Sequence, residues 1–149
     1  MSSLPEEVRL DDVMPVIKEK LAQGQSVRLY PKGVSMMPML RQGIDSVRLS
    51  PLPGKLKKYD LPLYQRRDGQ YVLHRIIKAE ETYTCIGDNQ FSYEKGVCQE
   101  QLIAVVTGFY RKDKFHSINS FWYKLYCRFW HKSRRIRGYW RWFKAKLKR

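Results

Sequence analysis

The 149-residue sequence has no apolar run that approaches the ~18 residues of a membrane-spanning helix. Its longest clean apolar run, LIAVVTGFY at 102–110, has the length of a strand. The N-terminus, MSSLPEEVRLDD, carries acids where a secretory signal peptide has a basic region and an apolar stretch. The sequence therefore predicts neither a spanning helix nor a signal peptide, and we expect a cytoplasmic protein.

Cysteine is also scarce, with only Cys85, Cys98 and Cys127 in the chain. The number is odd, and the three lack the C-x-x-C or Cys/His spacing of a metal site. We therefore expect no metal and no other cofactor. We expect reduced thiols, because few disulfides persist in the cytoplasm. The sequence does not exclude a disulfide at the surface.

Acidic residues are nearly missing from the last quarter of the chain. Residues 111–149 hold 14 Lys and Arg against one acid, Asp113, so they account for +13 of the formal net charge of +15. Residues 1–110 carry only +2. The basicity belongs to the C-terminal segment, so it does not describe the rest of the protein.

The pattern of apolar and turn residues divides the chain into three regions. Residues 1–26 form an N-terminal helical segment, since LDDVMPVIKEKLAQG at 10–24 has the period of a short amphipathic helix. Residues 27–110 alternate short β-rich runs with turns such as PLPG and RRDGQ, which predicts a small β-domain. Residues 111–149 form a basic amphipathic helical tail. The expected fold class is mainly β. The expected apolar face of the first helix holds Val13, Val16, Ile17 and Leu21.

A serine lies in an apolar loop, in the run GVSMMP at 33–38. Serine is common in loops and methionine fills irregular apolar gaps, so this run alone favours an ordinary loop. A serine nucleophile needs a base and a third group that orients the base. Of the three histidines, His116 and His131 lie in the basic tail without a nearby acid, which leaves His74.

His74 lies in the run YVLHRII, for which we expect a single strand. Strand alternation places His74 on the face of Val72 and Ile76, and Leu73 and Arg75 on the other. A histidine on an apolar face is more often a core residue than a catalyst. The candidate acids are Asp88 in CIGDNQ and Glu94 in FSYEKG, although Gly-Asp-Asn is also an ordinary turn sequence.

Five segments taken in order resemble the S24/S26 serine peptidases: VSMMP, GIDSVRL, YVLHRIIKAEE, CIGDNQ and LIAVVTGFY. Within that group the chain is most similar to the histidine-dependent signal peptidases of the endoplasmic-reticulum and archaeal type. The resemblance covers roughly residues 30–110 and implies a small signal-peptidase-like (S24/S26) β-domain. It also implies small residues at the two substrate positions that flank cleavage sites.

The resemblance assigns a role to each candidate. Ser35 is expected to be the acyl-forming nucleophile and His74 its general base, while Asp88 and Glu94 both match family acids. Which of the two acids orients the imidazole stays open. The expected oxyanion and substrate contacts come from Gly33, Val34 and Met36 around the backbone N–H of Ser35.

The chain departs from the family pattern in three ways. Gly33 stands where the family usually has a hydroxyl residue. The Gly-Asp pair that follows the nucleophile loop is split by Ile44. We also expect no N-terminal membrane anchor of the signal-peptidase type.

The basic tail suits a membrane interface, where aromatic rings lie at the headgroup level and Lys or Arg meets anionic lipid. One alternative is that one face of the helix packs on the β-domain. A less favoured alternative is that the tail binds nucleic acid, since aromatic and arginine side chains can stack on bases. We expect a protein peripheral to the inner face of the membrane. The predicted membrane-binding residues are Trp122, Trp130, Arg134, Arg135, Trp140 and Trp142.

The sequence therefore predicts a serine endopeptidase that cleaves a peptide or leader segment at a membrane surface. The alternative is a non-catalytic S24/S26-like scaffold whose basic tail binds lipid or nucleic acid. An autoprotease of the SOS-repressor kind is disfavoured, because no helix-turn-helix precedes the β-domain and no linker holds an Ala-Gly or Cys-Gly dipeptide.

Overall fold

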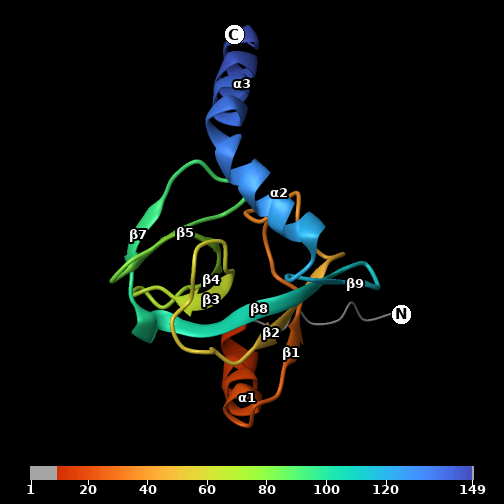
Figure 1. Cartoon of the computed structure of the whole chain (residues 1–149), viewed down its shortest axis with the longest axis vertical. Coiled ribbons are helices and arrows are strands. Elements are labelled where there is room, and N and C mark those ends of the chain that lie inside the picture. The colour runs from red at the N-terminus through yellow and green to blue at the C-terminus, as the bar shows by residue number, and fades with distance from the viewer. Residues whose placement is uncertain (1–9, 149) are drawn as a thin grey trace, which may run out of the picture.

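Two antiparallel sheets and three helices form the computed structural model, which describes residues 10–148 (Figure 1). Helix and strand each account for about 30% of the chain, so the expectation of a mainly β fold is met only in part. The helices are α1 (Leu10–Ala22), α2 (Phe121–Lys132) and α3 (Arg134–Leu147). The strands are β1 (Val27–Leu29), β2 (Ser46–Ser50), β3 (Pro62–Gln65), β4 (Tyr71–Leu73), β5 (Arg75–Ala79), β6 (Tyr83–Ile86), β7 (Glu94–Val97), β8 (Leu102–Arg111) and β9 (Lys114–Ser117).

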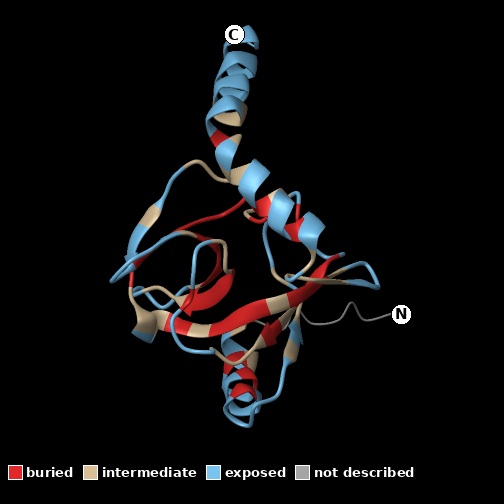
Figure 2. Cartoon of the chain, in the orientation of Figure 1, coloured by how far each residue is buried: buried red, intermediate tan, exposed pale blue. Residues whose placement is uncertain are grey.

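The long strand β8 organises the larger sheet. It pairs with β2, β3 and β9, and the path of the sheet runs β1-β2-β8-β3-β4. β8 contains the strand-length run LIAVVTGFY, and most of it is buried (Figure 2). The smaller sheet is β5-β6-β7. Both ends of the larger sheet, β1 and β4, therefore remain as edge strands beside the candidate site.

The expected single strand through His74 is wrong. β4 ends at Leu73 in the larger sheet, and β5 starts at Arg75 in the smaller one, so His74 lies where the chain passes from one sheet to the other. The cause is a change of partner: β4 pairs with β3, whereas β5 pairs with β6. His74 therefore does not follow the alternation of a continuous strand.

Helix α1 packs on the core with Met14, Ile17 and Leu21, which follow one another at helical spacing. Val16, which the sequence placed on this face, is exposed, and Met14 takes the buried position instead. Figure 1 shows α1 and α2 on either side of β8 in that view. Tyr123 and Cys127 of α2 join the same core cluster as α1.

The β-structure continues past the predicted boundary at residue 110. β9 forms a hairpin with the end of β8, and α2 starts only after Ser120, whose hydroxyl accepts a hydrogen bond from the N–H of Tyr123 at 3.1 Å. α2 packs on the domain and α3 extends away from it (Figure 1). Within residues 10–148, no helix has both the length and the apolarity needed to cross a bilayer.

Candidate active site

The loop that carries Ser35 is anchored by two methionines. Met36 and Met39 are buried in the core, while the N–H of Met37 donates to the carbonyl of Val34 at 3.2 Å. Gly33 has a φ of +85°, a left-handed conformation that glycine adopts without strain. The loop therefore holds Ser35 half-buried at the protein surface.

The Gly-Asp-Asn turn at 87–89 holds this loop in place through hydrogen bonds. The backbone N–H of Asn89 donates to the carbonyl of Ser35 at 2.8 Å, and the Asn89 side chain donates to the carbonyl of Val34 at 3.1 Å. A Cβ atom at Gly87 would lie 2.6 Å from the Ser35 carbonyl oxygen. The turn thus fixes the position of the serine through backbone contacts.

Asp88 points into the protein interior, where it forms a bidentate ion pair with Arg75. Nε and Nη2 of Arg75 donate to its two carboxylate oxygens at 2.8 and 2.9 Å, and the Tyr126 hydroxyl adds a third bond at 2.9 Å. Both members of the pair are fully buried. Burial would lower the pKa of Arg75, but the Asp88 carboxylate outweighs it and holds that pKa above its ordinary value.

Arg75 links three parts of the structure. Its Nη1 donates to the Tyr59 carbonyl at 3.1 Å and to the Tyr123 hydroxyl of α2 at 2.8 Å. Its Nη2 lies 3.1 Å from the sulfur of Met39, next to the serine loop. The Arg75–Asp88 pair is therefore a structural centre that joins β5, the Gly-Asp-Asn turn and α2.

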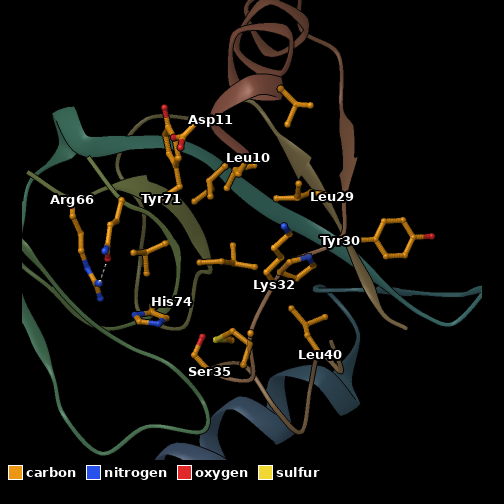
Figure 3. Close-up of a pocket in the computed structure, with 18 of the residues that line it drawn as sticks. Leu10, Asp11, Leu29, Tyr30, Lys32, Ser35, Leu40, Arg66, Tyr71 and His74 are labelled. Atoms are coloured by element: carbon orange, nitrogen blue, oxygen red, sulfur yellow. Dashed lines mark hydrogen bonds between the residues drawn. The ribbon is translucent and has the colours of Figure 1, made fainter. Parts of the chain in front are cut away.

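His74 is 5% exposed and lines one cavity together with Ser35. Figure 3 shows the Ser35 side chain and the His74 ring next to each other at this cavity, without a hydrogen bond drawn between them. Nδ1 of His74 has no hydrogen-bond partner and lies 4.0 Å from a carboxylate oxygen of Glu94. Burial first, and then the charge of Arg66, lowers the pKa of His74 from 6.5 to about 4.

Glu94 is held beside His74 by two side chains. The Tyr64 hydroxyl donates to Oε2 at 2.5 Å, and Arg66 donates to Oε1 at 2.9 Å and to Oε2 at 3.2 Å. Partial burial raises the pKa of Glu94, but these hydrogen bonds outweigh it and the net pKa lies below its usual value. Glu94 is therefore the ionised acid beside His74.

The structure thus separates the two candidate acids. His74 shares a cavity with Ser35 and lies 4.0 Å from Glu94, whereas the carboxylate of Asp88 accepts hydrogen bonds from Arg75 and Tyr126. Sequence reasoning missed Arg66 and Tyr64, which hold Glu94, and Arg75, which directly follows His74. The Arg after the histidine was a usable signal, because an arginine in an apolar run needs a buried partner.

The cavity that Ser35 and His74 share has a volume of about 880 Å³. Gly33 and Met36 line it, while Val34 is largely exposed and is not among its lining residues. Figure 3 shows Leu10 of α1, Leu29, Tyr30 and Tyr71 around the opening. Within residues 10–148 no cluster of three or more His, Cys, Asp or Glu side chains could hold a metal ion.

Two of the predicted membrane-binding residues, Trp130 and Arg134, form hydrogen bonds to the domain. The indole N–H of Trp130 donates to the carbonyl of Asp88 at 2.7 Å, and the guanidinium of Arg137 lies 3.6 Å from the centre of the indole ring. Arg134 is 5% exposed and donates to the Gln90 carbonyl at 3.2 Å. Both side chains therefore pack on the segment 88–90, and a membrane-binding role for them stays a prediction. Of the other four, Trp122, Arg135 and Trp140 are exposed, and Trp142 is about half-exposed and lines a cavity on the domain side of α3.

Comparisons with known proteins give no family assignment. A scan against protein-family models finds no match, and neither do searches of curated proteins and of solved structures. The function must therefore be inferred from the geometry of Ser35, His74 and Glu94 and from the sequence motifs that carry them.

Proposed function

We propose that this protein is a serine endopeptidase of the S24/S26 kind that cleaves a peptide or leader segment at a membrane surface. One observation carries the proposal: Ser35 and a buried His74 line the same cavity, and an ionised Glu94 lies 4.0 Å from the histidine nitrogen that has no partner. The rival reading, a non-catalytic scaffold, does not require these three side chains to meet.

The chemistry follows from the order of these side chains. His74 accepts the Ser35 hydroxyl proton through Nε2 as Oγ bonds to the substrate carbonyl carbon, and then gives that proton to the leaving amine as the C–N bond breaks. Water hydrolyses the resulting ester by the reverse proton path. As His74 becomes charged, Glu94 stabilises it, and a shift of about 1 Å brings Nδ1 and the carboxylate into hydrogen-bonding distance.

Both edges of the larger sheet border the cavity. Leu29 and Tyr30 come from the end of β1, and Tyr71, Val72 and Leu73 form β4. Edge strands present backbone N–H and C=O groups with which an extended peptide can pair. This arrangement suits an internal stretch of polypeptide, which supports an endopeptidase.

A membrane location is supported by α3, whose side away from the domain is apolar. The residues of this outer stripe recur at helical spacing and are between 41% and 70% exposed. They are Ile136, Tyr139, Trp140, Phe143 and Leu147. Arg135 and Lys146 flank the stripe on one side and Lys144 on the other, which is the charge pattern of a helix that lies on anionic lipid.

The pH dependence of catalysis tests the base. We expect kcat/KM to fall as the pH drops through about 4, because His74 must be neutral to accept a proton and burial lowers its pKa to about 4. The measurement is a pH profile of peptide hydrolysis, with activity after return to neutral pH as the control for unfolding. An acid limb at pH 6–7, or activity only above about pH 9, would count against this assignment.

The same shift sets a stability window. The unfolded chain binds a proton at His74 below about pH 6.5, whereas the folded chain does so only below about pH 4. The contribution of neutral His74 to the free energy of unfolding is therefore fully present above pH 6.5 and is lost as the pH falls to 4. The loss amounts to roughly 3 kcal/mol of unfolding free energy.

Gly87→Ala tests whether the Gly-Asp-Asn turn positions the nucleophile. The added methyl group must displace the Ser35 carbonyl, from which it would lie 2.6 Å, so kcat/KM is expected to fall about 100-fold. Chemical denaturation should still show a cooperative transition, because the change is confined to one loop. Unchanged hydrolysis by this variant would mean that the turn does not set the position of Ser35.

Vesicle binding tests the tail. The full chain should bind phosphatidylglycerol vesicles, with a blue shift of tryptophan emission, and release them as salt is raised above about 0.1 M, where exposed charges are screened within about 10 Å. Trp140→Ala removes a member of the outer stripe and should weaken binding several-fold. Trp142→Ala is the matched control, since Trp142 faces the domain side and lines a cavity.

Two results would overturn the membrane assignment. One is equal binding to phosphatidylglycerol and to neutral phosphatidylcholine vesicles. The other is binding of single-stranded nucleic acid far more tightly than lipid at the same salt concentration, which would favour the stacking alternative.

A further inference from the structure

A second cavity adjoins the first at His74. Its volume is about 920 Å³, and it shares Arg66, His74 and Gln90 with the cavity of Ser35. One wall is the segment 89–94, and the other is a face of α3 formed by Gly138, Arg141, Trp142 and Ala145. Ser35 lines the first cavity and is not among the residues of the second, so the two spaces adjoin at His74.

Three contacts hold α3 against this segment. Arg134 donates to the Gln90 carbonyl at 3.2 Å, and a Cβ atom at Gly138 would lie 3.3 Å from the ring of Phe91. Arg141 lies with its guanidinium 5.4 Å from the centre of the same ring. Positions 134, 138 and 141 are one helical face, so α3 turns this face to the domain and its outer stripe away from it.

The charges in this cavity are unbalanced. Among the described residues that line it, the carboxylate is that of Glu94, and Arg66 already holds both of its oxygens. Arg141 is therefore a cation without a carboxylate beside it in this space. Tyr93 and Trp142, about half-exposed, give the cavity aromatic walls on either side.

We propose that this second cavity binds the part of the substrate that follows the scissile bond, and that Arg141 is a specificity-determining residue that pairs with a carboxylate there. The inference rests on the proposed peptidase function. His74 gives its proton to the leaving amine, so the leaving segment lies on the histidine side of the site, where this cavity is. A guanidinium pairs well with a carboxylate, and the flanking rings accept apolar side chains.

The experiment measures binding to the Ser35→Ala protein, so that no turnover is needed. Three peptides of ten residues share alanines around the central bond and a tyrosine after it. They differ in the residue that follows the tyrosine and in the C-terminus: Glu with a C-terminal amide, Gln with an amide, and Gln with a free carboxylate. Calorimetric titration at low salt gives the three dissociation constants, and the last peptide separates a terminal carboxylate from a side-chain one.

We expect a carboxylate-bearing peptide to bind roughly 3- to 10-fold more tightly than the amidated Gln peptide. The effect is modest because an ion pair in contact with water contributes little free energy. Arg141→Lys should retain part of this preference and Arg141→Glu should abolish or invert it. Lys114→Glu is the control: it changes the net charge by the same amount as Arg141→Glu, at an exposed site in β9, and should leave the preference for a carboxylate intact. Equal binding of the three peptides, no measurable binding of any, or a preference retained in Arg141→Glu would overturn the inference. Acylation of Ser35 in the wild-type protein is measured separately, so failure here is distinguishable from failure of the peptidase proposal.

Discussion

Replacing Ser35 by Ala is expected to lower kcat/KM for peptide hydrolysis by several orders of magnitude, roughly 10³- to 10⁶-fold. The hydroxyl oxygen forms the bond to the substrate carbonyl in the proposed mechanism, and no other side chain can take over that role. The variant should fold like the wild type, because Met36 and Met39 anchor the loop and Ser35 itself is only half-buried.

The measurement compares hydrolysis of peptides that carry small residues at the central bond with a thermal unfolding curve of the same protein. A melting temperature within about 2 °C of the wild type, together with lost activity, would show that the hydroxyl acts chemically. Undiminished turnover by purified Ser35→Ala protein would rule out Ser35 as the nucleophile.

Asp88→Asn should produce the largest loss of stability among the site variants. The substitution removes the countercharge of a fully buried Arg75 and weakens the bond from Tyr126, which costs roughly 3–5 kcal/mol of unfolding free energy. Urea denaturation measures this loss. The effect on catalysis would be secondary, because the Gly-Asp-Asn turn that holds Ser35 loses its anchor.

Glu94→Gln is the matched variant at the other candidate acid. Glu94 is partly exposed and pairs with Arg66 near the surface, so this substitution should cost at most about 1 kcal/mol of stability. It should nevertheless slow hydrolysis about 10- to 10⁴-fold, because His74 loses the charge that stabilises its protonated form. The opposite outcome, with a stable but inactive Asp88→Asn and a fully active Glu94→Gln, would return the acid role to Asp88.

The sequence could indicate the candidate residues but not which of the two acids lies beside His74. The resemblance placed Ser35 and His74 in one site, and these two side chains line one cavity, but it left open whether Asp88 or Glu94 joins them. The burial of Arg75 depends on Asp88, 13 residues away, and on Tyr123, 48 residues away. Periodicity within one strand carries no information on such partners, so the passage of the chain between sheets at His74 was not predictable.

The tail illustrates the same limit. Its helical period was readable from the aromatic and basic residues, and α2 and α3 are present. Which face meets the domain depends on the Asp88 and Gln90 carbonyls, which receive Trp130 and Arg134. Every residue has a backbone carbonyl, so the sequence does not indicate which carbonyl accepts a hydrogen bond from a side chain. Trp130 and Arg134 therefore could not be distinguished from the exposed tryptophans and arginines of the tail.

Covalent labelling of Ser35 tests the peptidase proposal most directly, since it needs no knowledge of the natural substrate. The wild-type protein is incubated with an acylating serine-hydrolase probe at neutral pH, and the modified residue is located by peptide mass spectrometry; His74→Ala and heat-unfolded protein serve as controls. We expect one adduct per chain on Ser35, formed by the folded wild type and strongly reduced in His74→Ala. Labelling at other residues, or equal labelling of Ser35 with and without His74, would contradict the proposal.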